Sequence, residues 1–253
     1  MGKDSKIAWT SHTFNPFVGC QKVSPGCEHC YAEAQMHRYG RDVWGPNAPR
    51  ERTTDANWRK PLAWDREARE EDKRARVFCA SLADVFEDRH ELPPWRLDLW
   101  KLIASTTNLD WLLLTKRPEN MVRFTPTEWG SGWPENIWAG TTTENQSWFE
   151  KRREHLLEVP AKVRFLSIEP IVGPLDLRGK LAGIHWVIVG AESGHGARPM
   201  DYDWVRSIRD QTKEAGAAFF YKQAIVNGKK KELPEIDLAI TSALAITGPL
   251  ASS

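Results

Sequence analysis

The sequence has no long uninterrupted hydrophobic run, and its charges nearly cancel. Its 35 Lys and Arg residues stand against 34 Asp and Glu residues, which leaves a formal net charge of +1. Such a balance gives no global field toward nucleic acid or an anionic membrane, although a local basic groove remains compatible with it. No stretch approaches the roughly 18 to 20 apolar residues that cross a bilayer, and the opening MGKDSKIAWTSH lacks the apolar centre of a signal peptide. We therefore expect a cytoplasmic protein without membrane association.

Internal repeats and low-complexity linkers are also missing. With 253 residues, of which 41% are hydrophobic, the chain fits one large domain with a substantial core. We expect this domain to span residues 1–236, with an insertion or lid over 38–75 and a variable C-terminal tail over 237–253. The insertion interleaves arginines with tryptophans, a pattern that suits stacking on bases and pairing with phosphates. The alternative interpretation is an ordinary solvated lid.

Short apolar runs alternate with helix-like stretches through most of the chain. A first strand near 12–19 precedes runs at 76–87, 109–120, 136–146, 162–174, 183–194 and 216–223. Helical patterns cover about 28–39, 94–105, 144–157 and 201–214, the last with Asp201 as N-cap and Gly216 as stop. Each run is apolar on both alternating faces, as in a parallel strand covered on both sides. The order predicts an α/β fold, either a β/α barrel one unit short of closure or an open doubly wound sheet.

Polar residues end every apolar run. In parallel β/α folds the carboxyl ends of all strands face the same way and build the site together. We therefore expect these groups to converge on one cavity, although any strand must end in polar residues where it meets water. They are Ser81, Asp84, Thr115, Lys116, Arg117, Thr142, Glu144, Ser167, Glu169, Glu192, Ser193, Lys222 and Gln223.

Cysteine is scarce, yet three of the four thiols lie within residues 20–30. Cys20, Cys27 and Cys30 form C-x6-C-x2-C where the first strand gives way to the first helix. In a reducing compartment such clustering favours a metal site over a disulfide. The pattern suits a structural zinc, a catalytic zinc, an iron–sulfur cluster with one iron open to a small molecule, or three unrelated cysteines. The candidates for a fourth zinc ligand are His12, His29, His37 and Cys79, the last of which we expect to be simply buried.

The opening IAWTSHTFNPFVGCQKVSPGCEHCYAE resembles the start of the phage Gp37/Gp68-type proteins, also called the DUF5131 or three-Cys-motif family. The resemblance continues through SLADVFE, LLTKRPE, GTTTENQ, SIEPIVGPLDL, VIVGAESGHGARPM and FFYKQ, and covers most of residues 7–235. This family is in turn similar to radical S-adenosylmethionine (SAM) enzymes. That similarity implies a partial TIM-like barrel of parallel strands, a [4Fe-4S] cluster held by three cysteines, SAM on the fourth iron, and a 5′-deoxyadenosyl radical formed on reduction.

The resemblance also implies roles for individual residues. The cluster ligands are Cys20, Cys27 and Cys30, with six residues in place of the usual three between the first two, and a turn at Pro25 and Gly26 accommodates the extra length. His29 stands where an aromatic residue packs near adenine. The full implied SAM-binding set is His29, Ser81, Asp84, Glu169, Gly190 and Glu192. No catalytic side chain is assigned.

Charged strand-end groups predict an anionic or amine-bearing substrate. The predicted substrate-binding residues are Lys116, Arg117, Glu144, Arg198 and Lys222. The phage association of the family and the Arg/Trp insertion favour a nucleotide, a nucleic-acid base or a repair-type lesion. Such an enzyme requires an external electron donor, and a three-Cys-motif partner protein encoded nearby is a further candidate partner. The competing hypotheses are a zinc-stabilised nucleic-acid-binding protein without catalysis and a barrel that has lost its chemistry.

Overall fold

A curved sheet forms the centre of the computed structural model, which describes residues 5, 7–130, 132–194, 196–226 and 229–232. The sheet order is β1 (His12–Thr13), β4 (Ala75–Cys79), β5 (Leu109–Thr115), β6 (Ile137–Thr142), β7 (Val163–Ile168), β8 (Trp186–Gly190), β9 (Ala218–Val226) and β10 (Lys229–Glu232). The strands from β1 to β9 in this order are all parallel, and β10 adds antiparallel to β9. A separate ribbon pairs β2 (Phe17–Val18) with β3 (Glu51–Arg52).

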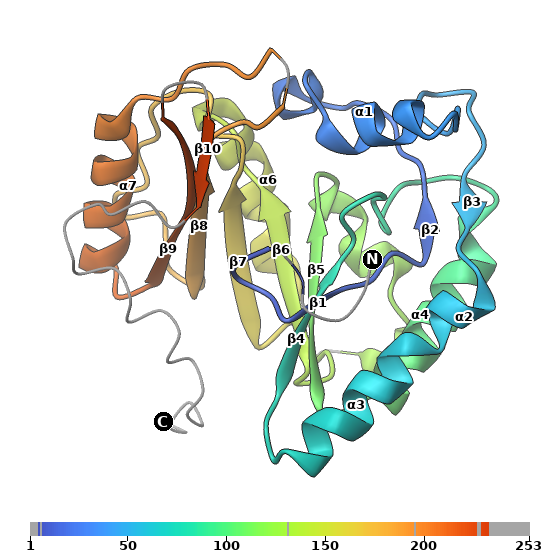
Figure 1. Cartoon of the computed structure of the whole chain (residues 1–253). Helices are drawn as coiled ribbons and strands as arrows, with labels where there is room; N and C mark the ends of the chain where they lie inside the picture. The colour runs from blue at the N-terminus through green and yellow to red at the C-terminus, as the bar shows by residue number, and fades with distance from the viewer. Residues whose placement is uncertain (1–4, 6, 131, 195, 227–228, 233–253) are drawn as a thin grey trace.

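Helices surround the sheet and one of them lies over its upper edge (Figure 1). They are α1 (Tyr31–Arg38), α2 (Asp55–Trp58), α3 (Lys60–Glu70), α4 (Leu92–Ser105), α5 (Met121–Phe124), α6 (Gln146–Glu158) and α7 (Tyr202–Glu214), with short 3-10 turns η1 (Pro25–Cys27), η2 (Pro118–Asn120) and η3 (Thr127–Trp129). The helix α3 packs on β4 and β5, α6 on β6, and α7 on β9. None of the helices within the described ranges combines the length and apolar character that a membrane crossing demands.

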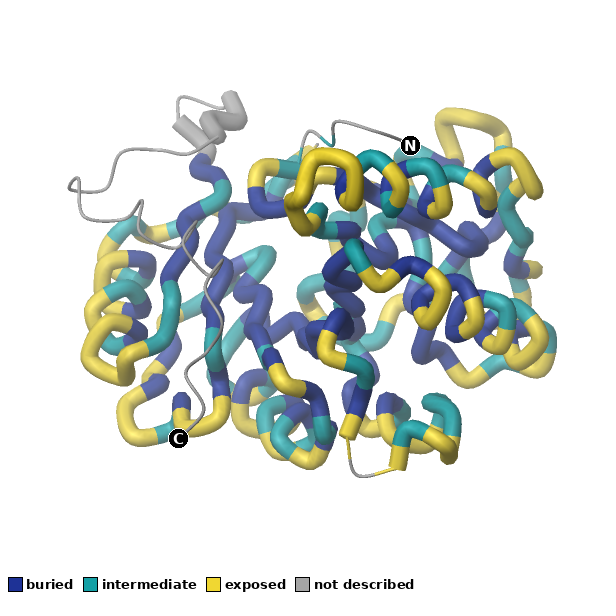
Figure 2. Tube along the Cα trace, turned by 90° about the horizontal axis from the view of Figure 1, so that it is seen from below, coloured by how far each residue is buried: buried dark blue, intermediate teal, exposed yellow. Residues whose placement is uncertain are grey.

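Both faces of the sheet are buried, as the apolar runs predict, and exposed residues lie on the outer turns of the helices (Figure 2). In β5, Trp111 and Leu113 join the core beneath the helices, whereas Leu112 between them joins an aromatic cluster on the opposite face. That cluster includes Trp9 and Trp186, whose rings meet edge to face at a centroid distance of 6.1 Å. The predicted partial barrel of parallel strands is therefore confirmed.

A glycine in β6 permits close packing on this aromatic face. The ring of Phe165, in the neighbouring β7, lies across Gly140 so tightly that a Cβ at that position would stand 2.2 Å from the ring. Real Cβ atoms do not approach so closely, so a side chain here would force the buried ring to move. The glycine therefore leaves the space that the Phe165 ring occupies on the aromatic face.

The helix and strand positions follow the sequence pattern closely, with differences at the two ends of the sheet. Asp201 caps α7 by accepting from the Asp203 N–H at 2.8 Å, and Gly216 has a positive φ of 71°, so both predictions are confirmed. The predicted first strand divides into β1, which joins the sheet, and β2, which pairs with β3. The antiparallel β10 was not anticipated, because its sequence KKKE carries no strand pattern. The predicted tail over 237–253 lies outside the described residues.

The segment predicted as an insertion contains helices that pack into the fold. Trp58 and Trp64 keep 8% and 4% of their surface exposed and belong to the main core. The Trp64 ring stacks on His12 of β1 at 4.4 Å, and the Arg52 guanidinium lies over the Trp58 ring at 4.3 Å. These two tryptophans are thus occupied by packing and cannot stack on bases, in contrast to what the Arg/Trp pattern suggests.

Candidate cofactor site

All three clustered cysteines line one cavity of about 580 Å³, a size typical of small-molecule sites. The cavity lies between α1 and the carboxyl ends of the parallel strands, where the topology predicts a site. The predicted site residues that line it are Cys20, Cys27, Cys30, Ser81, Asp84, Lys116, Arg117, Glu169 and Lys222. The predicted site residues outside its lining are His29, Glu144, Gly190, Glu192 and Arg198.

Three different local structures position the thiols. Cys20 follows β2 and forms an isolated bridge with Trp44, and its carbonyl accepts from the Gly45 N–H at 2.9 Å. Cys27 ends η1, and Cys30 is the residue immediately before α1. All three are half-buried and free, whereas Cys79 is fully buried in β4, away from the cavity, as expected.

Burial keeps two of the thiols protonated in the metal-free chain. It raises the pKa of Cys20 to about 12, with the nearby Asp84 carboxylate acting in the same direction against Arg117. Burial also raises the pKa of Cys30 above its usual value. Because metals bind thiolates, loading this site has to release protons.

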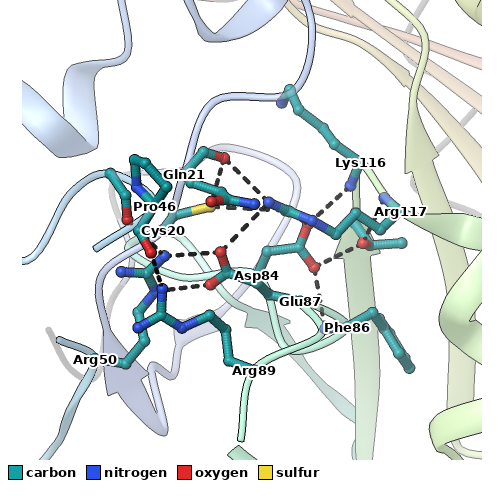
Figure 3. A network of polar contacts seen from close by, with 12 residues as sticks. Cys20, Gln21, Pro46, Arg50, Asp84, Phe86, Glu87, Arg89, Lys116 and Arg117 are labelled. Atoms are coloured by element: carbon teal, nitrogen blue, oxygen red, sulfur yellow. Dashed lines mark hydrogen bonds and ion pairs between the residues drawn. The ribbon is translucent and has the colours of Figure 1, made fainter. Parts of the chain in front are cut away.

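Arg117 lies beside Cys20 in a buried polar network (Figure 3). Its guanidinium donates to Asp84 at 2.8 Å and to the Gln21 carbonyl at 3.1 Å, and one nitrogen stands 3.8 Å from the Cys20 sulfur. Burial favours the neutral form of Asp84, but Arg117 and the Thr115 hydroxyl outweigh it, so the pKa of this carboxyl is lowered. Arg117 and Asp84, expected to contact substrate and SAM, are thus committed chiefly to each other.

A second buried ion pair lies beneath this network and has no sequence signal. Arg50 donates to both Glu87 oxygens at 2.7 and 2.8 Å, and both side chains are essentially inaccessible. The same guanidinium donates to the carbonyls of Val43, Gly45 and Ala48. Figure 3 shows Arg50 and Arg89 approaching this region from one side and Arg117 from the other. The pair ties the segment directly before β3 to the segment after β4.

Glu144 follows β6 and contacts the thiol-bearing segment. One carboxylate oxygen accepts from the Gly26 N–H at 3.1 Å, and the other accepts from Arg152 of α6 at 2.7 Å. The Glu144 and Arg152 side chains are 0% and 1% exposed. Burial would raise the pKa of Glu144, but Arg152 and Lys116 hold it below its usual value. Glu144 is therefore a buried, charged anchor.

Arg198 makes a third contact of the same kind. Its guanidinium pairs with Glu192 at 2.6 Å and also reaches Glu28 at 3.0 Å and the Pro25 carbonyl at 2.9 Å. Burial opposes ionisation of Glu192, yet the bonds from Arg198 lower its pKa overall. Through these contacts Arg198 and Glu192, predicted to bind substrate and SAM, join β8 to the segment around η1.

Of the remaining predicted residues, some line the cavity and others pack against its surroundings. Glu169 lines the cavity and pairs with Lys222 at 2.6 Å. A Cβ at Gly190 would stand 3.0 Å from the Glu169 carboxylate, so this glycine leaves space for that side chain. His29 packs against Gly196, where a Cβ would be 3.3 Å from its ring.

Several cavity residues escaped the sequence analysis. Tyr31 is one of them, and its hydroxyl donates to the Ser81 carbonyl at 3.0 Å. The aromatic residues of the lining are Trp9, Tyr31, Trp44 and Phe78. Tyr31 had a signal, because it directly follows Cys30, whereas an aromatic residue such as Trp9 is indistinguishable in sequence from a core residue.

Three thiols at one cavity are the kind of donor set that can hold an iron–sulfur cluster. Within the described ranges, no three Cys, His, Asp or Glu side chains meet as ligands of one ion. Cys27 at the end of η1, Cys30 directly before α1 and Cys20 all line the same cavity. Cysteine thiolates hold such clusters, and because each binds a different iron, they need not converge on one point.

The fold is similar to that of spore photoproduct lyase, a radical SAM enzyme. A mutant of that lyase with bound AdoMet and dinucleoside spore photoproduct matches with a TM-score of 0.50 and 12% identity over 85% of this chain. The lyase complexed with dinucleoside spore photoproduct matches with a TM-score of 0.51 and 11% identity over 85% of this chain. The chain spans 64% of the length of each. At such identity the likeness establishes the fold class, a radical-SAM-type partial barrel.

The family model DUF5131, described as a protein of unknown function, matches residues 4–235. The chain belongs to this family, as the opening motif and the later segments predict. No curated protein shows a significant match to the chain.

Proposed function

We propose that this protein is a radical SAM enzyme that binds a [4Fe-4S] cluster through Cys20, Cys27 and Cys30. The observation that carries the proposal is the meeting of all three thiols in one cavity at the carboxyl ends of a radical-SAM-type barrel. When bound, the cluster and SAM together supply on reduction a carbon radical that takes a hydrogen atom from a substrate.

The cavity residues divide into proposed roles. Ser81 and Glu169 face the cavity and are the proposed direct SAM contacts, because a hydroxyl and a carboxylate accept hydrogen bonds from amine and ribose groups. Asp84 acts through Arg117 rather than by touching SAM. The other members of the predicted SAM set, His29, Gly190 and Glu192, support the cavity wall from behind.

A nucleotide-type substrate is the best match to the rest of the cavity. Aromatic side chains on its wall offer faces on which a base can stack. Lys116 and Lys222 supply positive charge for a phosphate or another anionic group. The similar lyase structures hold a dinucleoside spore photoproduct, a ligand of this chemical class. We therefore propose modification or repair of a nucleotide or nucleic-acid substrate, with electrons from an external donor.

The zinc hypothesis lacks a matching geometry. A structural zinc requires four ligands that converge tetrahedrally, and within the described part of the chain no such group is present. A near-zero net charge also gives no general attraction to nucleic acid, so binding without catalysis would depend on a local surface alone.

Reductive cleavage of SAM tests the proposed activity. We expect the anaerobically reconstituted chain to convert SAM to methionine and 5′-deoxyadenosine on reduction, as measured by chromatography. Cys27→Ala is expected to reduce this rate by more than about a hundredfold, because a cluster ligand is lost. The matched control is Cys79→Ala, which removes a thiol that is buried away from the cavity and should retain the activity. Equal rates in wild type and Cys27→Ala would refute the proposal.

A further inference from the structure

The segment that carries the thiols has little structure of its own. This cysteine loop, residues 20–30, contains a single 3-10 turn, η1, between β2 and α1. Its first two thiols are separated by six residues, so the chain between them is long and has to be held from outside. The question is which groups hold it.

Three ion pairs reach the cysteine loop from three different strands. Arg117, after β5, contacts the Gln21 carbonyl and the Cys20 sulfur. Glu144, after β6, accepts from the Gly26 N–H. Arg198, after β8, donates to the Pro25 carbonyl and pairs with Glu28. The contacts are distributed along the loop from its first thiol to the residue after its second.

Each group that contacts the loop is itself fixed by a buried partner. Asp84 holds Arg117, Arg152 holds Glu144, and Glu192 holds Arg198, at 2.8, 2.7 and 2.6 Å. The partner keeps the contacting group charged and in one orientation, so the loop is tied to a rigid sheet rather than to flexible side chains.

We propose that Arg117, Glu144 and Arg198 are positioning residues that fix the cysteine loop before any cofactor binds. The identity of the loop as a cluster-binding segment rests on the proposed function. The set of contacts from these three residues to the loop, which we call the clamp, is a property of the metal-free chain. Pre-ordering reduces the conformational entropy that cofactor binding has to overcome. It also gives these three residues a role other than the substrate contacts that their sequence positions suggest.

Hydrogen exchange in the metal-free chain tests the clamp. Arg198 is the most accessible of the three, with a side chain that is 26% exposed against 7% for Arg117 and 0% for Glu144, although its removal leaves the Glu192 carboxylate, 4% exposed, without its partner. We expect Arg198→Ala to speed amide exchange in peptides covering 21–28 by about tenfold, with the exchange of β5 and β6 unchanged. Arg198→Lys should give an exchange rate between those of wild type and Arg198→Ala, because the lysine ammonium lacks the forked N–H donors by which the guanidinium reaches several partners together.

The control removes an arginine–carboxylate pair on the surface elsewhere. Arg178 pairs with Asp176 at 2.7 Å on the surface, away from the cysteine loop, so Arg178→Ala should leave loop exchange at the wild-type rate. An unchanged loop in Arg198→Ala would overturn the proposal. Should that variant fail to fold, Glu28→Gln replaces it, because Glu28 is 61% exposed and its loss removes one contact. We then expect about threefold faster exchange, and no increase would equally overturn the proposal.

Iron content of the same variants separates this inference from the proposed function. After reconstitution, Arg198→Ala should bind less iron per chain than wild type, with weaker visible absorbance, and Arg198→Lys should recover part of it. If wild type takes up no iron while loop exchange responds as expected, the clamp stands and the proposed function fails. If wild type loads fully and the loop of Arg198→Ala exchanges like wild type, the proposed function stands and the clamp fails.

Discussion

The charged residues at the strand ends fall into two groups: some reach into the cavity, and others pair with buried partners in its wall. Lys116 and Arg117 are neighbours in sequence, yet Lys116 reaches Thr142 in the cavity while Arg117 turns toward Asp84. Removing one partner from such a buried pair leaves an uncompensated charge, which is strongly destabilising. The predicted set of substrate contacts therefore divides into residues that face the cavity and residues that hold its wall.

The buried Glu144 carboxylate makes stability depend on pH. Its pKa in the folded chain lies below the usual 4.5, so its contribution is fully present above that pH and is lost as the pH falls through the folded value. Glu144→Gln cannot ionise, and leaves Arg152 without a counter-charge. We expect the variant to be less stable than wild type by about 2 to 4 kcal/mol near pH 7. Urea denaturation measures this gap, which should shrink as the pH falls below about 4.5.

The control for this prediction is Glu150→Gln, which removes an exposed carboxylate on α6 that pairs with Lys180. A surface pair contributes little, so this variant should stay close to wild type at both pH values. A gap for Glu144→Gln that keeps its full size in acid would contradict the assignment of Glu144 as a buried anion.

Sequence reasoning reached the positions of the charged residues but not their partners. The topology of parallel strands places every strand end on one side, so the sequence order is enough to gather Ser81, Lys116 and Glu169 at one cavity. The pairing of Arg50 with Glu87 spans 37 residues and depends on how the loops fold, which no local pattern encodes. The same holds for the pairing of Arg198 with Glu28, which are 170 residues apart in the sequence.

At the scale of helices and strands, apolar periodicity predicts the six main strands and most helices, because both faces of the sheet are covered. The polar residues that end each run lie beyond the strand: β4 stops at Cys79, and the predicted strand-end residues Ser81 and Asp84 follow it. The stretch over 38–75 was harder to interpret, because charged residues obscure the buried face of α3. Trp64 and Ala68, four residues apart, form that face.

The packing of α3 predicts a stability role for its tryptophan. Trp64 is buried against His12 and the core, so Trp64→Ala should lower the free energy of unfolding by about 3 to 5 kcal/mol. Urea denaturation monitored by circular dichroism measures this loss. Trp44→Ala, which removes a half-buried tryptophan of the same 38–75 segment, is the control and should lower the free energy of unfolding by less. A Trp64→Ala chain as stable as wild type would indicate that the segment is a lid rather than part of the core.

At the scale of the whole molecule, the sheet of the partial barrel is buried on both faces, one toward the helices and one toward the barrel interior. The cavity lies at the rim formed by the carboxyl ends of the strands. That rim carries the thiols, the strand-end carboxylates and the lysines in one cavity. The fold class matches radical SAM enzymes, although the chain spans 64% of the length of the similar lyase. The reaction and substrate thus belong to the proposal, while the family and the architecture are established.

The iron and sulfide content after anaerobic reconstitution tests the central claim most directly. We expect about four irons and about four sulfides per chain, with visible absorbance that is lost on Cys20→Ala, Cys27→Ala or Cys30→Ala but kept on Cys79→Ala. A preparation that holds one tightly bound zinc and takes up no iron would contradict the account.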